Sequence, residues 1–222
     1  MIMKKTISIV VLALAAFLPV QAVAQNLKTA GKGVADIVPG GWESTFKQGD
    51  LNHDGIADLV VIATPCNKEK MKVRDDGYVY NFNQPVLAIY WGKKGGGFSL
   101  FKQYGKAIPA RASEFLSITP SVDITSKGVL KISIEYFASA GSWSQPTTTY
   151  LFRYQNGDFF LIGKDENELA RNTGKTVETS ENYLTRKRCV TTANAFNNKK
   201  PVVKWSRLPK APLKALGFSL EQ

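Results

Sequence analysis

One short stretch of the chain places oxygen-bearing side chains at alternate positions. Asp50, Asn52 and Asp54 are followed by Gly55 and then by a further carboxylate, Asp58. Calcium prefers about six to eight oxygen ligands, and alternate spacing lets one tight loop wrap several of them around a single ion. Gly55 supplies the sharp turn, because glycine adopts positive φ without steric cost. The pattern predicts a Ca²⁺ loop whose ligands are Asp50, Asn52, Asp54, the carbonyl oxygen of Ile56, and Asp58.

An ordinary β-turn that binds no ion is the alternative, because Asp, Asn and Gly all favour turns. An EF-hand does not fit, since Val61 stands where that motif places a bidentate Glu, and β-forming residues follow the loop. The order Asp-x-Asn-x-Asp-Gly-x-x-Asp before an apolar strand instead resembles the calcium loop of FG-GAP repeats, found in integrin alpha-chain propellers. This resemblance covers only the loop and the start of the strand, and it implies the same ligands. The motif occurs once, so a multi-bladed propeller is not expected.

Few residues are available for catalysis. His53 is the only histidine and lies inside the acidic stretch, and no Gly-x-Ser-x-Gly elbow is present. A pair of carboxylates for hydrolysis of a glycan remains an option. The candidates are Glu114, Asp123, Glu135 and Asp158. Acids at strand ends are usually surface residues, so no catalytic residue is assigned.

Ligand binding by aromatic side chains is the stronger interpretation. Trp143 lies among Ser, Gly, Gln and Pro rather than in an apolar strand, and Tyr136 precedes it by seven residues. Together with Phe137 and the pair Tyr90-Trp91 they are candidates for a platform that stacks on sugar rings. The alternative, that these aromatic side chains fill the core or cover sheet faces, is favoured for them, and Trp143 is the best exception.

The N-terminus has the features of a secretory signal peptide. A short basic start precedes an apolar run over residues 7–20 and the small-residue segment Ala22-Val23-Ala24. These features predict a signal peptide over residues 1–24, cleaved before Gln25. The apolar run is too short to span a membrane. We therefore expect a periplasmic or secreted protein with no membrane span.

The chain is basic, with 29 Lys and Arg against 18 Asp and Glu and a net charge of +11. The basic residues are scattered in small groups, and no nucleic-acid-binding motif accompanies them, so a solvated surface is favoured over a nucleic-acid partner. The two cysteines, Cys66 and Cys189, form either one disulfide, as an oxidising compartment favours, or two buried free thiols.

The hydrophobic pattern is that of β-structure almost throughout. Residues 59–63 and 86–91 are continuous apolar runs, typical of strands covered on both faces. Asn156-Gly157 predicts a type I′ hairpin that sets Tyr154 opposite Phe159, Phe152 opposite Leu161 and Leu151 opposite Ile162. Short helices are expected over residues 110–116, 180–188 and 212–216, and a last strand over residues 202–208. Residues 25–41 are either a loose arm or a short edge strand.

These observations predict a mainly β protein: a single domain over residues 25–222, built on a twisted antiparallel sheet or sandwich with a few short helices. The order of motifs also resembles a group of uncharacterised exported bacterial proteins. The shared motifs are the acidic loop, residues 141–145 (Gly-Ser-Trp-Ser-Gln), the hairpin of residues 149–162, and residues 180–185 (Ser-Glu-Asn-Tyr-Leu-Thr). That resemblance implies compartment and fold rather than an activity.

Two functions follow from the sequence. The first is an exported, calcium-stabilised binding or interaction module whose partner is an envelope glycan or a protein. The second is a carboxylate-dependent hydrolase of an envelope polymer. The first is favoured: in it the acidic loop binds a structural calcium ion and the aromatic residues bind the partner. The oligomeric state is not indicated by the sequence.

Overall fold

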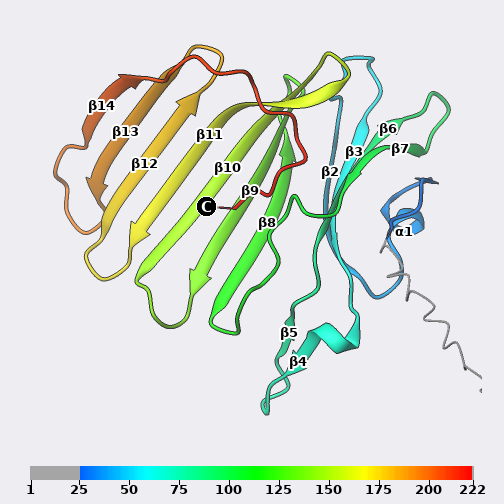
Figure 1. Ribbon diagram of the computed structural model, residues 1–222, viewed down its shortest axis with the longest axis horizontal. Coiled ribbons are helices and arrows are strands. Elements are labelled where there is room, and N and C mark those ends of the chain that lie inside the picture. The colour runs from blue at the N-terminus through cyan, green and yellow to red at the C-terminus, as the bar shows by residue number, and fades with distance from the viewer. Residues whose placement is uncertain (1–25, 222) are drawn as a thin grey trace, which may run out of the picture.

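The computed structural model describes residues 26–221, and the predicted signal peptide lies outside them. The described chain is mainly β, as expected from the sequence, and all its strand pairs are antiparallel. It forms two large sheets and one small hairpin (Figure 1). No helix in this part of the chain is long and apolar enough to cross a lipid bilayer.

The N-terminal sheet has the strand order β1-β7-β6-β3-β2. Its strands are β1 (Ala30–Gly31), β2 (Glu43–Gly49), β3 (Asp58–Thr64), β6 (Val86–Gly92) and β7 (Phe98–Tyr104). The segment before β2, expected to be either a loose arm or an edge strand, contains the edge strand β1 and the short helix α1 (Val34–Ile37).

The C-terminal sheet has its seven strands in the order of the sequence, from β8 at one edge to β14 at the other. The strands are β8 (Leu116–Ile124), β9 (Val129–Ala138), β10 (Ser144–Gln155), β11 (Asp158–Ala170), β12 (Lys175–Asn182), β13 (Lys187–Asn194) and β14 (Val202–Arg207). The sheet is curled, and the C-terminal segment runs back across it (Figure 1). That segment is attached by a bridge between Ala215 and Phe160.

A small hairpin extends away from the two sheets (Figure 1). It consists of a single 3₁₀ turn (Lys68–Lys70) followed by β4 (Met71–Val73) and β5 (Val79–Asn81). A turn at Asp75-Asp76-Gly77 connects the two strands, and Gly77 adopts a positive φ of 84° there. The hairpin therefore projects from the link between β3 and β6.

Two clusters of buried side chains hold the sheets together. The larger cluster lies between them and includes Ile62 and Ile89 from the N-terminal sheet and Ile132 and Phe152 from the C-terminal sheet. The second covers the opposite face of the N-terminal sheet, where Ile37 of α1 packs with residues such as Val61 and Tyr90. β3 and β6 are continuously apolar because both of their faces are buried, as the sequence predicted.

The hairpin at Asn156-Gly157 has the predicted turn, since both residues adopt positive φ, 50° and 81°. Tyr154 lies opposite Phe159 and Phe152 lies opposite Leu161, which confirms that part of the register. Leu151 lies opposite Gly163 instead of Ile162, because the register shifts between Leu151 and Phe152. An extra residue on one strand at this bulge moves every later pair by one position.

The three expected helices are absent from the described structure. Residues 110–115 are irregular and lead directly into β8, while residues 180–188 span the end of β12, a turn and the start of β13. Residues 212–216 are extended and contain the bridging residue Ala215. Short segments with weak helix propensity adopt the conformation that contacts with the surrounding sheet favour. The predicted last strand is present as β14.

Of the two alternatives for the cysteines, the structure has the free thiols rather than the disulfide, and both Cys66 and Cys189 are half-buried rather than buried. Cys66 follows β3 in the N-terminal sheet. Cys189 lies in β13, where it pairs with Ser180 and Trp205. β3 and β13 stand on opposite sides of the molecule (Figure 1), and a disulfide needs Cα atoms within about 7 Å of each other.

Candidate functional site

The acidic loop, residues 50–58, connects β2 to β3 and packs closely against the end of β6 and the β8–β9 turn. Leu51 anchors the loop in the main core, where only 1% of its surface is exposed. A Cβ added at Gly92, at the end of β6, would lie 2.3 Å from the carbonyl oxygen of Ala57. A Cβ added at Gly128, in the β8–β9 turn, would lie 2.9 Å from the carbonyl oxygen of Asp50. The loop is therefore a contact point between the two sheets.

The side chains of the loop bind its own backbone. The two carboxylate oxygens of Asp50 accept hydrogen bonds from the backbone N–H groups of His53 (2.7 Å) and Gly55 (2.9 Å). Asn52 accepts from the backbone N–H of Asp54 at 3.0 Å, and Asp54 accepts from that of Ile56 at 2.8 Å. These bonds form the tight turn that the alternate spacing predicted, and both His53 and Gly55 adopt positive φ within it.

Asp58 closes the loop from inside the protein. Its side chain is fully buried, and its two oxygens accept from the backbone N–H groups of Leu51 and Gly92, each at 2.9 Å. Burial raises the pKa of the Asp58 carboxyl, and the two N–H bonds oppose this shift. The negative charges of Asp54 and Asp50 raise the pKa further. The carboxylates of the loop therefore repel each other.

The donor chemistry of the loop fits calcium, because carboxylate, amide and carbonyl oxygens are the ligands that this ion prefers. Each carboxylate oxygen that accepts one N–H bond keeps a lone pair for a second partner. None of the ion pairs found in residues 26–221 involves Asp50, Asp54 or Asp58. The arrangement is not a finished metal centre, however: in this part of the chain no group of three or more His, Cys, Asp or Glu side chains could hold a metal ion. A bound ion would have to draw the ligands closer together.

Trp143 lies on the loop between β9 and β10 and is 64% exposed. The guanidinium of Arg171, which follows β11, lies 5.8 Å from the ring centre of Trp143 and 4.6 Å from that of Phe137. Arg171 also donates hydrogen bonds to the carbonyl oxygens of Ala138 (2.8 Å) and Ser142 (2.9 Å). The arginine thus fixes the loop and two exposed aromatic rings in one arrangement.

The other aromatic candidates belong to the interior. Tyr136 packs against the main core, so it does not share one platform with Trp143. Tyr90 is fully buried, and its hydroxyl donates to the carbonyl oxygen of Lys28 at 2.9 Å. Trp91 packs against the rings of Phe101 and Tyr154. Sequence reasoning singled out Trp143 from its polar neighbours but missed Arg171, which lies 28 residues away along the chain.

The four acids considered for hydrolysis each bind a different partner. Glu114 pairs with Lys72, and Asp123 with Lys47 at 2.9 Å. Glu135 accepts from Gln145 at 2.8 Å, and Asp158 pairs with Lys102 at 2.7 Å. Each of the four carboxylates therefore belongs to a different ion pair or hydrogen bond. They give no support to a catalytic pair.

A cavity of about 430 Å³ lies beneath the C-terminal segment, lined by Tyr150, Lys164 and Tyr183 among others. Three of its polar side chains, those of Tyr150, Lys164 and Tyr183, have partners within the protein. The Tyr150 hydroxyl donates to the carbonyl oxygen of Glu221 at 2.8 Å, and Lys164 pairs with Glu166 at 2.9 Å. Burial raises the pKa of Tyr150 to about 12, so its hydroxyl stays neutral. These three side chains are therefore already engaged, and the cavity is not assigned a ligand.

Comparisons with known proteins returned no matching family model, curated protein or solved structure. The likeness of the acidic loop to FG-GAP repeats accordingly stays a prediction, and the functional interpretation depends on the geometry of the described residues.

Proposed function

We propose that this protein is an exported interaction module. In it, the acidic loop holds one Ca²⁺ as a structural ion, and the surface around Trp143 binds an envelope glycan or a protein. The observation that carries the proposal is the exposed stack of Trp143, Arg171 and Phe137. No comparable argument supports catalysis, since the candidate acids occupy separate contacts.

The composition of this surface favours recognition. Tryptophan and arginine are the residue types most enriched among those that dominate binding energy at interfaces. A large aromatic ring offers apolar area together with a polar edge, which suits the faces of sugar rings. Because Arg171 binds the carbonyl oxygens on both sides of the loop, the rings are ordered before a partner arrives, which lowers the entropic cost of binding.

The calcium part of the proposal rests on the charges of the loop. The negative charges of Asp50 and Asp54 raise the pKa of Asp58, and no Lys or Arg among the described residues forms an ion pair with any of the three. A divalent cation would compensate these charges. Since the loop contacts the ends of β6 and β8, the ion would act on the junction of the two sheets.

The calcium site is tested by thermal unfolding of the purified protein in EDTA and in about 10 mM calcium. Loops of this kind in extracellular modules bind with dissociation constants of about 0.1–1 mM. Such binding would stabilise the fold by about 1.4–2.7 kcal/mol, which raises Tm by roughly 3–10 °C for a chain of this size. The double variant Asp50→Ala/Asp54→Ala should lose the shift. Equal melting temperatures in EDTA and calcium would leave the loop an ordinary turn.

The binding surface is tested on a glycan array with the wild-type protein, Trp143→Ala and Trp205→Ala. Trp205 is a matched control, because it is 69% exposed but lies in β14 at the far edge of the C-terminal sheet. We expect Trp143→Ala to reduce binding to the retained glycans about tenfold or more, and Trp205→Ala to leave it unchanged. Equal effects of the two variants would argue against a specific surface.

A further inference from the structure

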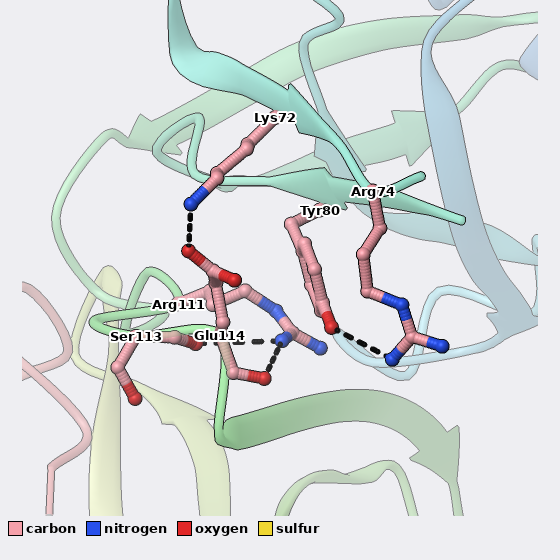
Figure 2. A network of polar contacts seen from close by, with 6 residues as sticks. All are labelled: Lys72, Arg74, Tyr80, Arg111, Ser113 and Glu114. Atoms are coloured by element: carbon pink, nitrogen blue, oxygen red, sulfur yellow. Dashed lines mark hydrogen bonds and ion pairs between the residues drawn. The ribbon is translucent and has the colours of Figure 1, made fainter. Parts of the chain in front are cut away.

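A recess of about 320 Å³ lies between the projecting β4–β5 hairpin and the edge of the C-terminal sheet. Six of its lining residues are Arg74, Tyr78, Tyr80, Arg111, Phe115 and Phe137. Figure 2 shows how the recess is held together: Lys72 of the hairpin forms an ion pair with Glu114, in the segment before β8. This contact attaches the hairpin to the sheet.

Arg111 has unused binding capacity. Its Nη1 donates to the carbonyl oxygens of Ser113 (3.4 Å) and Glu114 (3.2 Å), and its guanidinium lies 5.1 Å from the ring centre of Tyr80 (Figure 2). Within residues 26–221 it forms no ion pair, and its Nε and Nη2 donate to no acceptor. A guanidinium held by neutral groups keeps its full charge for a ligand, and its planar fork matches a carboxylate.

The recess is continuous with the surface around Trp143 through Phe137, which lines the recess and also lies under Arg171. Exposed rings and guanidinium groups are both present on this surface: Tyr78 and Phe115 are more than half exposed, and Arg171 lies over the rings of Phe137 and Trp143. Arg171, like Arg111, donates only to carbonyl oxygens and has no carboxylate partner among the described residues. A ligand that covers this surface would meet aromatic faces and two uncompensated positive charges.

We propose that this recess binds the carboxylate of an acidic sugar, and that the ligand is a uronic-acid-bearing glycan whose next rings stack on Phe137 and Trp143. The proposal rests on the binding function proposed above and specifies the chemical class of the glycan. A volume of about 320 Å³ lies at the small end of ligand pockets, which begin at about 300 Å³. One unit of a chain therefore enters the recess, and the remainder lies on the exposed rings.

The lining also separates an acidic glycan from single-stranded nucleic acid, which likewise binds arginine and aromatic side chains. Glu114 and Ser117 also line the recess, and Asp76 binds Arg74, another lining residue, through an Nε–Oδ1 hydrogen bond of 2.9 Å. These oxygens accept hydrogen bonds from sugar hydroxyls. A single strand of DNA has few hydroxyl donors to offer these oxygens, so it would leave them without hydrogen-bond partners.

The experiment measures binding by isothermal titration calorimetry in about 1 mM calcium. The probes are oligogalacturonate, its methyl ester, in which the charge is removed but the rings are kept, and oligo(dT). The protein is compared with Arg111→Gln, with Arg74→Gln, whose side chain is exposed, with Trp143→Ala, and with the control Arg153→Gln. Arg153 is an exposed arginine near the other end of β10, so it matches the loss of charge without touching the recess.

We expect oligogalacturonate to bind and its methyl ester and oligo(dT) to bind at least tenfold more weakly. Arg111→Gln should weaken oligogalacturonate about tenfold to a hundredfold, since it removes a charged hydrogen-bond donor. Arg74→Gln should weaken it less, and Arg153→Gln should have no effect. Melting temperatures of the variants show whether each one is folded.

Three results would overturn this inference. If the methyl ester binds as tightly as the acid, and Trp143→Ala alone abolishes binding, the surface recognises neutral sugars; the binding function then stands and the acidic specificity fails. If oligo(dT) binds equally well, or Arg153→Gln weakens binding as much as Arg111→Gln, the attraction is a general effect of the basic charge. Failure of all glycans to bind would remove the proposed glycan function as well.

Discussion

The two charged regions of this molecule lie at opposite ends of β8 and β9 and are built in opposite ways. The acidic loop packs on the β8–β9 turn, and its carboxylates point inward to backbone N–H groups, with Asp58 fully buried. The recess lies at the start of β8 and the end of β9, about 30 Å away along β9. There the charges belong to arginines, and they are held by carbonyl oxygens and aromatic rings.

The difference indicates which property each region controls. A buried charge bound by the backbone cannot be removed without leaving N–H groups unsatisfied, so it acts on stability. An exposed charge adds little to stability, but it is available to a ligand. Because regions this far apart behave independently, variants of the loop should change unfolding and variants of the recess should change binding. The predictions below test that separation.

The largest effect is expected for Asp58→Ala. The change leaves the backbone N–H groups of Leu51 and Gly92 without acceptors inside the protein. We expect a loss of about 2–4 kcal/mol in the free energy of unfolding, because each unsatisfied group costs about 1–3 kcal/mol and relief of a buried charge offsets part of the sum. Equilibrium unfolding in urea measures this loss.

The matched control for that prediction is Asp123→Ala, which removes an exposed carboxylate from its ion pair with Lys47. Such surface pairs contribute at most about 1 kcal/mol, so Asp123→Ala should be nearly neutral. Arg74→Gln, in the recess, should also leave unfolding unchanged. If Asp58→Ala were as mild as these two variants, the contrast between buried and exposed charge would fail.

A smaller effect is expected for Gly92→Ala. The new Cβ would lie 2.3 Å from the carbonyl oxygen of Ala57 and 2.7 Å from Cγ2 of Ile56. The backbone of the acidic loop would have to move, which costs about 1–3 kcal/mol of stability and should weaken the response to calcium. Gly105→Ala is the control, because a Cβ at Gly105 meets nothing within 4 Å. Thermal unfolding with and without calcium compares the two variants, and equal behaviour would contradict the packing of the loop on β6.

The smallest effect concerns pH. Without calcium, the folded protein should hold the Asp58 proton more tightly than the unfolded chain does, because burial and the charges of Asp54 and Asp50 raise the pKa of Asp58. Stability then falls as pH rises from the ordinary aspartate pKa of about 3.9 through the raised value. Calcium should lower the pKa of Asp58, because a cation favours the ionised form. An NMR titration of the Asp58 carboxyl carbon in EDTA and in calcium measures both values; an ordinary pKa in EDTA would contradict the prediction.

Local sequence patterns were sufficient for several elements. The continuous apolar runs over residues 59–63 and 86–91 predicted strands covered on both faces, and almost all of these residues are buried in β3 and β6. The Asn-Gly pair defined the β10–β11 turn, and the predicted register holds from the turn back to Phe152. The bulge between Leu151 and Phe152 then shifts it. No local pattern predicted the bulge. Leu151 and Ile162 would make a suitable cross-strand pair, whereas the observed pair of Leu151 with Gly163 is unusual.

The recess was not predicted, because its members are spread over the chain. Arg74 belongs to a projecting hairpin, Arg111 to an irregular segment, and Phe137 to the end of β9. The segment of Arg111 was expected to be helical, which would have directed its residues differently. A signal was present in the mixture of basic and aromatic residues over 72–80, but composition alone does not show what a hairpin packs against.

The sequence by itself determined the mainly β architecture, the turn chemistry of the acidic loop and the exposure of Trp143, because each depends on neighbours within a few residues. Only the tertiary structure decided that Asp58 is buried between β3 and β6, that the cysteines stay apart, and that Arg171 and Arg111 lie beside exposed rings. These features depend on contacts between residues tens of positions apart. Such contacts are fixed by how the sheets pack and curl, which no local pattern records.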